Sequence, residues 1–295
     1  MNLFDLHCDA AFRMDRERIT PLSTKLHVNA KGVRAFGQVT QVFAFWCDKN
    51  EDDQSAYLSF FRMYRGLRRK IGLYGPHLTP YLSVEDGRLL CYETERLETL
   101  YRLGIRIFTP LWGDRNALGC AHNAASDTGL TAFGVAACLE AMRLGMICDL
   151  SHASLGSAEE LLALSLSARR PVVASHSAFS AICPHTRNLT DRQALAVKER
   201  GGLIGLAAVP AFLAGEDASV ADMVAHIKHG LSLGLSGCLC LGCDFDGTDT
   251  LPHGMTDISS ILRLARMLSD GGLTDLEIDC LLWRSASEFF KKNIT

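Results

Sequence analysis

Short apolar runs recur along the whole chain, and most of them are followed by a longer amphipathic stretch. Eight of the runs have the near-continuous apolar character of strands that are buried on both faces. They lie at residues 3–7, 39–45, 79–84, 105–109, 146–150, 171–174, 203–207 and 237–241. Helical spacing of apolar positions is found at 56–71, 93–103, 131–144, 157–168, 191–200, 219–233, 258–268 and 274–290. The pattern predicts alternating strands and helices.

This alternation indicates a parallel sheet with helices packed outside it. Eight strand–helix units in 295 residues fit an α/β fold of the (β/α)8 TIM-barrel type. No linker rich in Pro, Gly or Ser divides the chain, so we expect one domain over residues 1–295. An open doubly wound sheet is the alternative, but its glycine loop after strand one is replaced here by Cys8-Asp9-Ala10-Ala11.

Histidines and carboxylates occur at or just after the carboxyl ends of five of the predicted strands. They are His7, Asp9, Glu85, His152, His176 and Asp244. Each has an ordinary structural interpretation: a lone histidine is more often hydrogen-bonded than a ligand, and carboxylates serve in caps and turns. In a barrel, however, all these ends surround one mouth. Three histidines and two or three carboxylates exceed the needs of one tetrahedral zinc, so the pattern indicates two metal ions about 3.5–4 Å apart.

Composition narrows the classes of partner and compartment. The chain is 48% apolar and carries a net charge of −3, which gives no reason to expect nucleic acid or an anionic membrane as a partner. We see no secretory signal, no lipid-anchor tail and no apolar run of the roughly 18 residues that cross a membrane. Eleven scattered cysteines indicate a reducing compartment, the cytoplasm. Cys238, Cys240 and Cys243 could bind a soft metal, but their placement favours core packing.

Motifs at the strand ends and between them resemble those of the membrane (renal-type) dipeptidases, a branch of the amidohydrolase superfamily with a binuclear zinc barrel. The matching stretches begin with Asp-Leu-His-Cys-Asp at 5–9 and Ser-Val-Glu-Asp-Gly at 83–87. They continue at residues 103–112, 129–134, 144–152, 171–177, 186–191 and 241–247. The resemblance covers most of the chain in the right order, and it implies a metal-dependent amidohydrolase barrel.

The resemblance also implies a role for each residue. His7 and Asp9 would bind one Zn²⁺, His152 and His176 a second, and Glu85 would bridge both. Asp244 would take a proton from the bridging hydroxide and give it to the leaving amine, with Asp246 as the other candidate. Three residues would contact the substrate. Arg187 would bind the terminal carboxylate of the substrate, and Asn188 and Trp112 would lie beside it. Apart from the resemblance, Asp5 shares the strand face of His7 and Asp9 and sits one step deeper, so we expect it to support them through a hydrogen bond.

The implied activity is hydrolysis of small dipeptides, L-Xaa-L-Xaa or L-Xaa-D-Xaa, by the metal-bridging hydroxide. The family resemblance leaves a homodimer open. Two alternatives remain: another amidohydrolase, such as a lactonase or phosphotriesterase-like enzyme, and a metal-binding barrel without catalysis. The first normally bridges its metals with a carboxylated lysine after strand four, where this chain has no lysine at 106–110.

Two departures from the family pattern affect the site and the end of the chain. Mammalian members have a histidine after strand four that polarises the substrate carbonyl, whereas this chain reads Thr109-Pro110-Leu111-Trp112, like the bacterial branch. His122 is a candidate substitute. The final helix reads Trp-Arg-Ser-Ala-Ser at 283–287 and lacks the Gly-x-Asn of the family, so we expect different local packing there.

Overall fold

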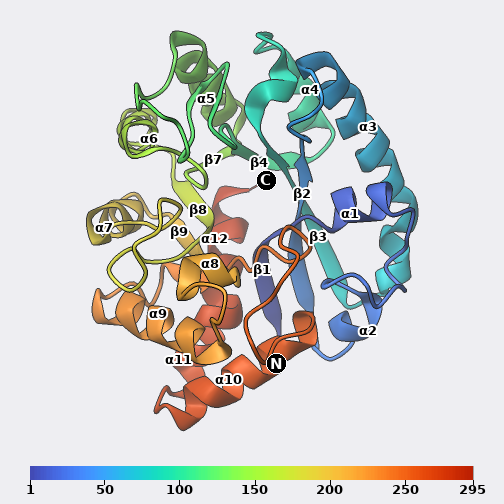
Figure 1. The fold of residues 1–295 in the computed structure, drawn as a ribbon, viewed down its shortest axis with the longest axis vertical. Coiled ribbons are helices and arrows are strands. Elements are labelled where there is room, and N and C mark those ends of the chain that lie inside the picture. The colour runs from blue at the N-terminus through green and yellow to red at the C-terminus, as the bar shows by residue number, and fades with distance from the viewer. Residues whose placement is uncertain (295) are drawn as a thin grey trace.

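The eight apolar runs form parallel strands that close into a barrel in the computed structural model, which describes residues 1–294 (Figure 1). In order around the barrel they are β1 (Leu3–Cys8), β2 (Val39–Trp46), β3 (Leu78–Glu85), β4 (Ile105–Thr109), β7 (Ile147–Asp149), β8 (Val172–Ser177), β9 (Leu203–Leu206) and β10 (Leu239–Leu241). The last strand, β10, pairs with β1, so Asp5 lies opposite Leu241. The prediction of a TIM barrel is confirmed.

Helices surround the strands, as Figure 1 shows. They are α1 (Ala10–Arg16), α2 (Ala30–Val33), α3 (Asp53–Lys70), α4 (Arg96–Arg102), α5 (Ala132–Leu144), α6 (Leu155–Ala168), α7 (Asp191–Glu199), α8 (Pro210–Leu213), α9 (Val220–Ser232), α10 (Ile261–Asp270), α11 (Asp275–Asp279) and α12 (Ser285–Asn293). Polar caps fix several helix starts; the Thr131 side chain, for example, accepts the Gly134 N–H before α5. Among the described residues, no helix has both the length and the apolar character needed to cross a membrane.

The structure also contains short elements that the apolar pattern did not predict. A small antiparallel pair, β5 (Arg115–Asn116) and β6 (Gly119–Cys120), follows β4. The 3-10 turns are η1 (Ile71–Tyr74), η2 (Gly87–Leu90) and η3 (Ile258–Ser260). The helix predicted at 274–290 is divided into α11, a π-helical segment η4 (Cys280–Arg284) and α12. The predicted domain over 1–295 includes Thr295, which lies outside the described residues.

Two apolar clusters form the core. The larger fills the layer between strands and helices, and it contains Cys238 and Cys243. The smaller lies inside the barrel, where Cys240 packs with Phe4, and aromatic residues of α12 such as Phe290 close it. All eleven cysteines are free, and the predicted core packing of the three around β10 is confirmed.

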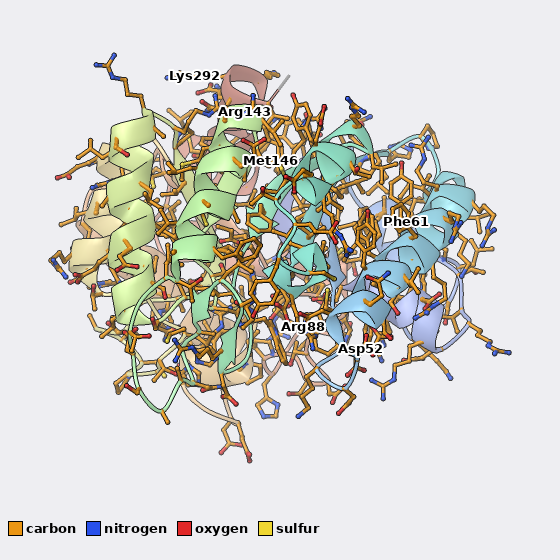
Figure 2. All side chains as sticks on the ribbon, turned by 90° about the horizontal axis from the view of Figure 1, so that it is seen from above. Asp52, Phe61, Arg88, Arg143, Met146 and Lys292 are labelled. Atoms are coloured by element: carbon orange, nitrogen blue, oxygen red, sulfur yellow. The ribbon has the colours of Figure 1, made fainter. Side chains whose placement is uncertain are left out.

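The barrel has a closed end and an open end. Figure 2 shows Lys292 of α12 at the same end as Met146, which directly precedes β7. Arg88 and Asp52, which follow β3 and β2, lie toward the other end in the same view. The helix α12 therefore covers the end where strands begin, and the carboxyl ends of the strands are left for a site.

Two glycines allow β8, β9 and β10 to approach closely. A Cβ atom on Gly242 would lie 1.6 Å from the carbonyl oxygen of Ser175, and one on Gly205 would lie 2.0 Å from the same oxygen. We expect Gly242→Ala to lower the free energy of unfolding by about 1–3 kcal/mol or more, because backbone atoms must move apart. Urea unfolding measures this. Gly237→Ala is the matched control, because no atom lies within 4 Å of the added carbon, and equal losses would contradict the prediction.

Candidate active site

The carboxyl ends of β1, β3, β7 and β8 bring the five predicted ligands together. His7 lies on β1, Glu85 is the last residue of β3, and His176 lies on β8. Asp9 directly precedes α1, and His152 follows β7 in a turn with a left-handed φ of 67°. All except His152 are buried, and the His152 side chain is only 11% exposed.

Glu85 lies between two groups of possible ligands. Its Oε2 atom is 3.4 Å from Nε2 of His7, which is itself 3.2 Å from Oδ2 of Asp9. Its Oε1 atom is 2.7 Å from Nε2 of His152 and 3.4 Å from Nε2 of His176. The two carboxylate oxygens thus face different partners, which is the arrangement that a bridging carboxylate requires.

Asp244 and Asp246 have different surroundings. Oδ1 of Asp244 lies 3.7 Å from Nε2 of His7, so this carboxylate joins the predicted ligands. Asp246 instead accepts the backbone N–H groups of His27 at 2.7 Å and Val28 at 3.0 Å. Its carboxylate therefore holds a neighbouring loop. Of the two candidates for the acid/base, the structure brings only Asp244 close to His7.

Opposing charges and burial set the protonation of these groups. Burial disfavours the charged form of Glu85, but His7 and His152 hold its pKa well below the usual value. Burial raises the pKa of Asp244 well above its usual value; His7 opposes this, and the carboxylates of Asp9 and Glu85 add to it. A carboxyl group with a raised pKa beside an ionised one is suited to transfer protons near neutral pH.

The donor set fits a metal centre. Oδ1 of Asp9 is buried and has no hydrogen-bond partner in the described part of the chain. Two ring nitrogens, Nε2 of His152 and of His176, lie only 2.9 Å apart and share one oxygen of Glu85. Two groups have donor atoms within 4.8 Å of one another: His7, Glu85, His176, and His7, Asp9, Asp244. Imidazole nitrogens and carboxylate oxygens are ligands that zinc prefers.

Two buried aspartates, Asp5 and Asp149, accept backbone N–H groups at or next to the candidate ligands. Asp5 accepts the backbone N–H of His7 at 3.1 Å and of Cys243 at 2.9 Å, so it joins β1 to the segment before Asp244. It also accepts the side-chain amide of Gln41 at 2.7 Å. The support expected of Asp5 is thus observed, and it acts on the backbone of His7 rather than on its ring.

The second aspartate, Asp149, was not predicted. Its Oδ1 accepts the backbone N–H groups of Ser151 and Ser175, each at 2.9 Å, and its Oδ2 accepts the Ser175 hydroxyl at 2.5 Å. Because that hydroxyl donates to Asp149, it accepts from Nδ1 of His176, 2.8 Å away. The Nε2 atom of His176 is then left without a proton and free to bind a metal. The sequence signal for Asp149 was its position three residues before the predicted ligand His152.

Arg187 and Asn188 lie beside the site. Arg187 is buried, donates from one terminal nitrogen to the carbonyl of His176 at 3.1 Å, and packs over the ring of Phe212 at 5.1 Å. Its Nε has no hydrogen-bond partner within residues 1–294. Asn188 donates from Nδ2 to the carbonyls of Cys183 and Phe212, each at 2.8 Å. Asn188 thereby joins the loop at Cys183 to helix α8, whose Phe212 ring packs against Arg187.

Trp112 and His122 both approach His152. The Trp112 ring centroid lies 6.0 Å from that of His152, and the His122 centroid lies 5.8 Å from it. Nδ1 of His122 forms a hydrogen bond of 2.9 Å with the Thr186 hydroxyl. Trp112, together with Asp9, Glu85, His152 and Asp244, lines a cavity of about 790 Å³, within the range of small-ligand sites.

Known proteins share both the sequence pattern and the fold. The family model of the membrane dipeptidases, peptidase family M19, matches residues 73–292, which include Glu85, His152, His176 and Asp244. An uncharacterized protein in the pqqA 5′ region of Klebsiella pneumoniae is 33% identical over 204 residues, 65% of this chain and 74% of that protein. An uncharacterized dipeptidase of Schizosaccharomyces pombe is 30% identical over 220 residues, 73% of this chain and 53% of that protein. The chain thus spans about half the length of the yeast relative.

Solved structures of metallopeptidases have the same fold. A metallopeptidase from Rhodobacter sphaeroides, bound to a phosphinate mimic of the dipeptide L-Ala-D-Ala, superposes with a TM-score of 0.87. The match covers 99% of both chains at 19% identity, so it establishes the fold. The family model covers most of the chain, including residues that meet at the barrel mouth. The chain therefore belongs to the membrane dipeptidase family, peptidase family M19.

Proposed function

We propose that this protein is a binuclear zinc dipeptidase that hydrolyses small L,L or L,D dipeptides. The observation that carries the proposal is Glu85, whose two oxygens face separate groups of ligand atoms. Membership of the dipeptidase family supports the reaction class. We further propose that the chain acts as one catalytic domain, and its free cysteines support a cytoplasmic location.

In this proposal, His7 and Asp9 hold one Zn²⁺, His152 and His176 hold the second, and Glu85 contacts both. Bound there, the ions supply an activated water and a polarised substrate carbonyl. Asp244 accepts a proton from the attacking water and delivers it to the amide nitrogen as the C–N bond breaks. Its position 3.7 Å from His7 supports this role.

Arg187 is proposed to bind the terminal carboxylate of the substrate, because a guanidinium group matches a carboxylate in two hydrogen bonds. Its packing over Phe212 and its bond to the His176 carbonyl hold the group beside the ligands. Asn188 positions Arg187 by joining the loop at Cys183 to helix α8, and Trp112 forms part of the substrate wall.

Hydrolysis of dipeptides by zinc-reconstituted protein tests the proposal. We expect release of free amino acids from L,L or L,D dipeptides and about two zinc ions per chain on metal analysis. Lactones and phosphotriesters serve as competing substrates, although β4 reads Ile-Arg-Ile-Phe-Thr and offers no lysine to bridge metals. Hydrolysis of those esters without dipeptide cleavage would overturn the proposal, as would a metal-loaded protein that hydrolyses neither.

Asp149→Asn is expected to weaken one of the two zinc sites by about 10- to 100-fold. The asparagine oxygen is needed at the Oδ1 position, where it accepts two backbone N–H groups, so the NH₂ group faces Ser175. An NH₂ group cannot accept the Ser175 hydroxyl, which therefore turns toward Nδ1 of His176. The imidazole proton then moves to Nε2, the proposed ligand atom. Competition with a chromophoric chelator measures both zinc affinities without reference to activity.

The matched control for this substitution is Asp127→Asn. Asp127 also accepts a serine hydroxyl, that of Ser154, and backbone N–H groups at Gly129 and Gly156. Asp127 lies in the loop before α5, and its carboxylate contacts the start of α6. It supports no candidate ligand directly, so both zinc affinities should be unchanged. Unaltered affinities in folded Asp149→Asn protein would refute the role given to Asp149.

A further inference from the structure

The cavity above the candidate ligands has an aromatic wall formed by Phe12, Trp46 and Trp112. The Phe12 ring stands edge-on to Trp46, with centroids 4.7 Å apart and an interplanar angle of 83°. Trp46 and Trp112 lie 4.9 Å apart, and Trp112 continues the row to His152 at 6.0 Å. All three wall residues are half-buried, so each exposes part of its ring to the cavity.

The Trp46 end of this wall lies across the barrel mouth from Arg187. Trp46 is the last residue of β2, whereas Arg187 donates to the carbonyl of His176 on β8. Three strands separate β2 from β8 on either side: β3, β4 and β7 in one direction, and β1, β10 and β9 in the other. The two strands therefore stand on opposite sides of the closed barrel, with the ligand atoms between them.

A dipeptide bound by its carboxylate at Arg187 must extend across the ligands toward the wall. The amide bond then lies over Glu85 and the histidines, and the N-terminal residue meets Trp46. We propose that Phe12, Trp46 and Trp112 form the pocket for the N-terminal side chain and that the enzyme prefers aromatic or large apolar residues there. This inference rests on the proposed dipeptidase function and on the carboxylate contact assigned to Arg187.

The charged residues beside the wall do not change this preference. Arg13 and Glu17, which also line the cavity, pair with each other at 2.9 Å. Arg16 lies at the rim, with its Cζ 5.8 Å from the Phe12 ring, and its side chain is exposed. Water and salt screen an exposed guanidinium, so it discriminates weakly between acidic and neutral side chains. The ring surfaces, in contrast, gain from every apolar atom that they remove from water.

A dipeptide series with constant C-terminal alanine tests the inference on zinc-loaded protein. The N-terminal residue is glycine, alanine, leucine, phenylalanine, tryptophan, aspartate or lysine. We expect kcat/KM for L-Phe-L-Ala to exceed that for Gly-L-Ala by about ten- to a hundredfold, the factor that burial of an aromatic side chain supplies. Equal rates across the series, or a preference for glycine or aspartate, would overturn the inference while leaving the dipeptidase function intact. Cleavage of none of the series would overturn both.

Variants locate the preference on the wall. Trp46→Ala is expected to lower kcat/KM for L-Phe-L-Ala about tenfold, mainly through KM, and to leave Gly-L-Ala within about twofold. Retained Gly-L-Ala turnover shows that the variant folds, and Trp46→Phe should restore most of the preference. The control Tyr92→Ala removes an aromatic ring that is 68% exposed outside the cavity. Equal losses for both dipeptides in Trp46→Ala and Trp46→Phe would contradict the pocket.

Discussion

Asp244→Asn is expected to lower kcat for dipeptide hydrolysis by about 10²- to 10⁴-fold, the usual contribution of a positioned acid/base. Asp244 has a left-handed backbone with φ of 61°. Asparagine keeps the size of the side chain and tolerates this positive φ. It cannot accept a proton from water or deliver one to the departing nitrogen. His7, Asp9, Glu85, His152 and His176 are unchanged, so the protein should still bind zinc.

The pH profile separates chemistry from folding in this variant. Below the pKa of Asp244 the carboxyl group is protonated and cannot act as a base, so activity of the parent protein should fall as pH decreases. Burial raises that pKa, and Asp9 and Glu85 raise it further, although His7 opposes them. The residual activity of Asp244→Asn should lack this acidic limb, which stopped-flow or steady-state rates across pH can measure.

Asp246→Asn is the matched control for Asp244. Its carboxylate accepts two backbone N–H groups, at His27 and Val28, and asparagine can accept through only one oxygen. We expect a loss of about 1–3 kcal/mol in the free energy of unfolding with a far smaller change in kcat. A large loss of kcat in Asp246→Asn, together with full activity in Asp244→Asn, would reverse the two assignments.

The apolar pattern predicted the barrel because its strands are buried on both faces. All eight strands were found, since short apolar runs such as those of β9 and β10 are too short for helices and fit buried strands between the predicted helices. The pair β5 and β6 was missed, because two-residue strands have no period that a pattern can reveal. The π-helical segment η4 was read as ordinary helix because its apolar spacing stays nearly helical; its Trp283 packs against Phe4 at 6.1 Å.

The sequence was informative about candidate ligands but not about what supports them. Histidines and carboxylates at the ends of apolar strands stand out, since carboxylates are rarely buried unless they are paired. Asp149 was hidden because it reads as the end of an apolar strand, and its partner Ser175 is 26 residues away. The choice between Asp244 and Asp246 likewise depends on His27, which lies 219 residues away in sequence from Asp246.

Glu85→Gln is expected to remove at least one of the two zinc ions and to lower kcat by about a thousandfold or more, because a metal pair supplies several kcal/mol of transition-state stabilisation. Glutamine has the same shape, but it replaces one anionic oxygen with an NH₂ group that does not bind metals. In the parent protein, Oε2 of Glu85 faces His7 and Oε1 faces His152 and His176. Either orientation of the glutamine amide therefore deprives one of these two groups of its shared ligand.

Metal analysis and thermal unfolding measure this loss independently of activity. A ligand that binds only the folded state stabilises it according to its free concentration and affinity, so added zinc should raise the Tm of the parent protein more than that of Glu85→Gln. Glu17→Gln makes the same chemical change at the cavity rim, where Glu17 pairs with Arg13 at 2.9 Å, and it should keep both ions. Two tightly bound zinc ions in Glu85→Gln would show that the metals do not depend on a shared carboxylate, and the binuclear proposal would then lose the observation on which it rests.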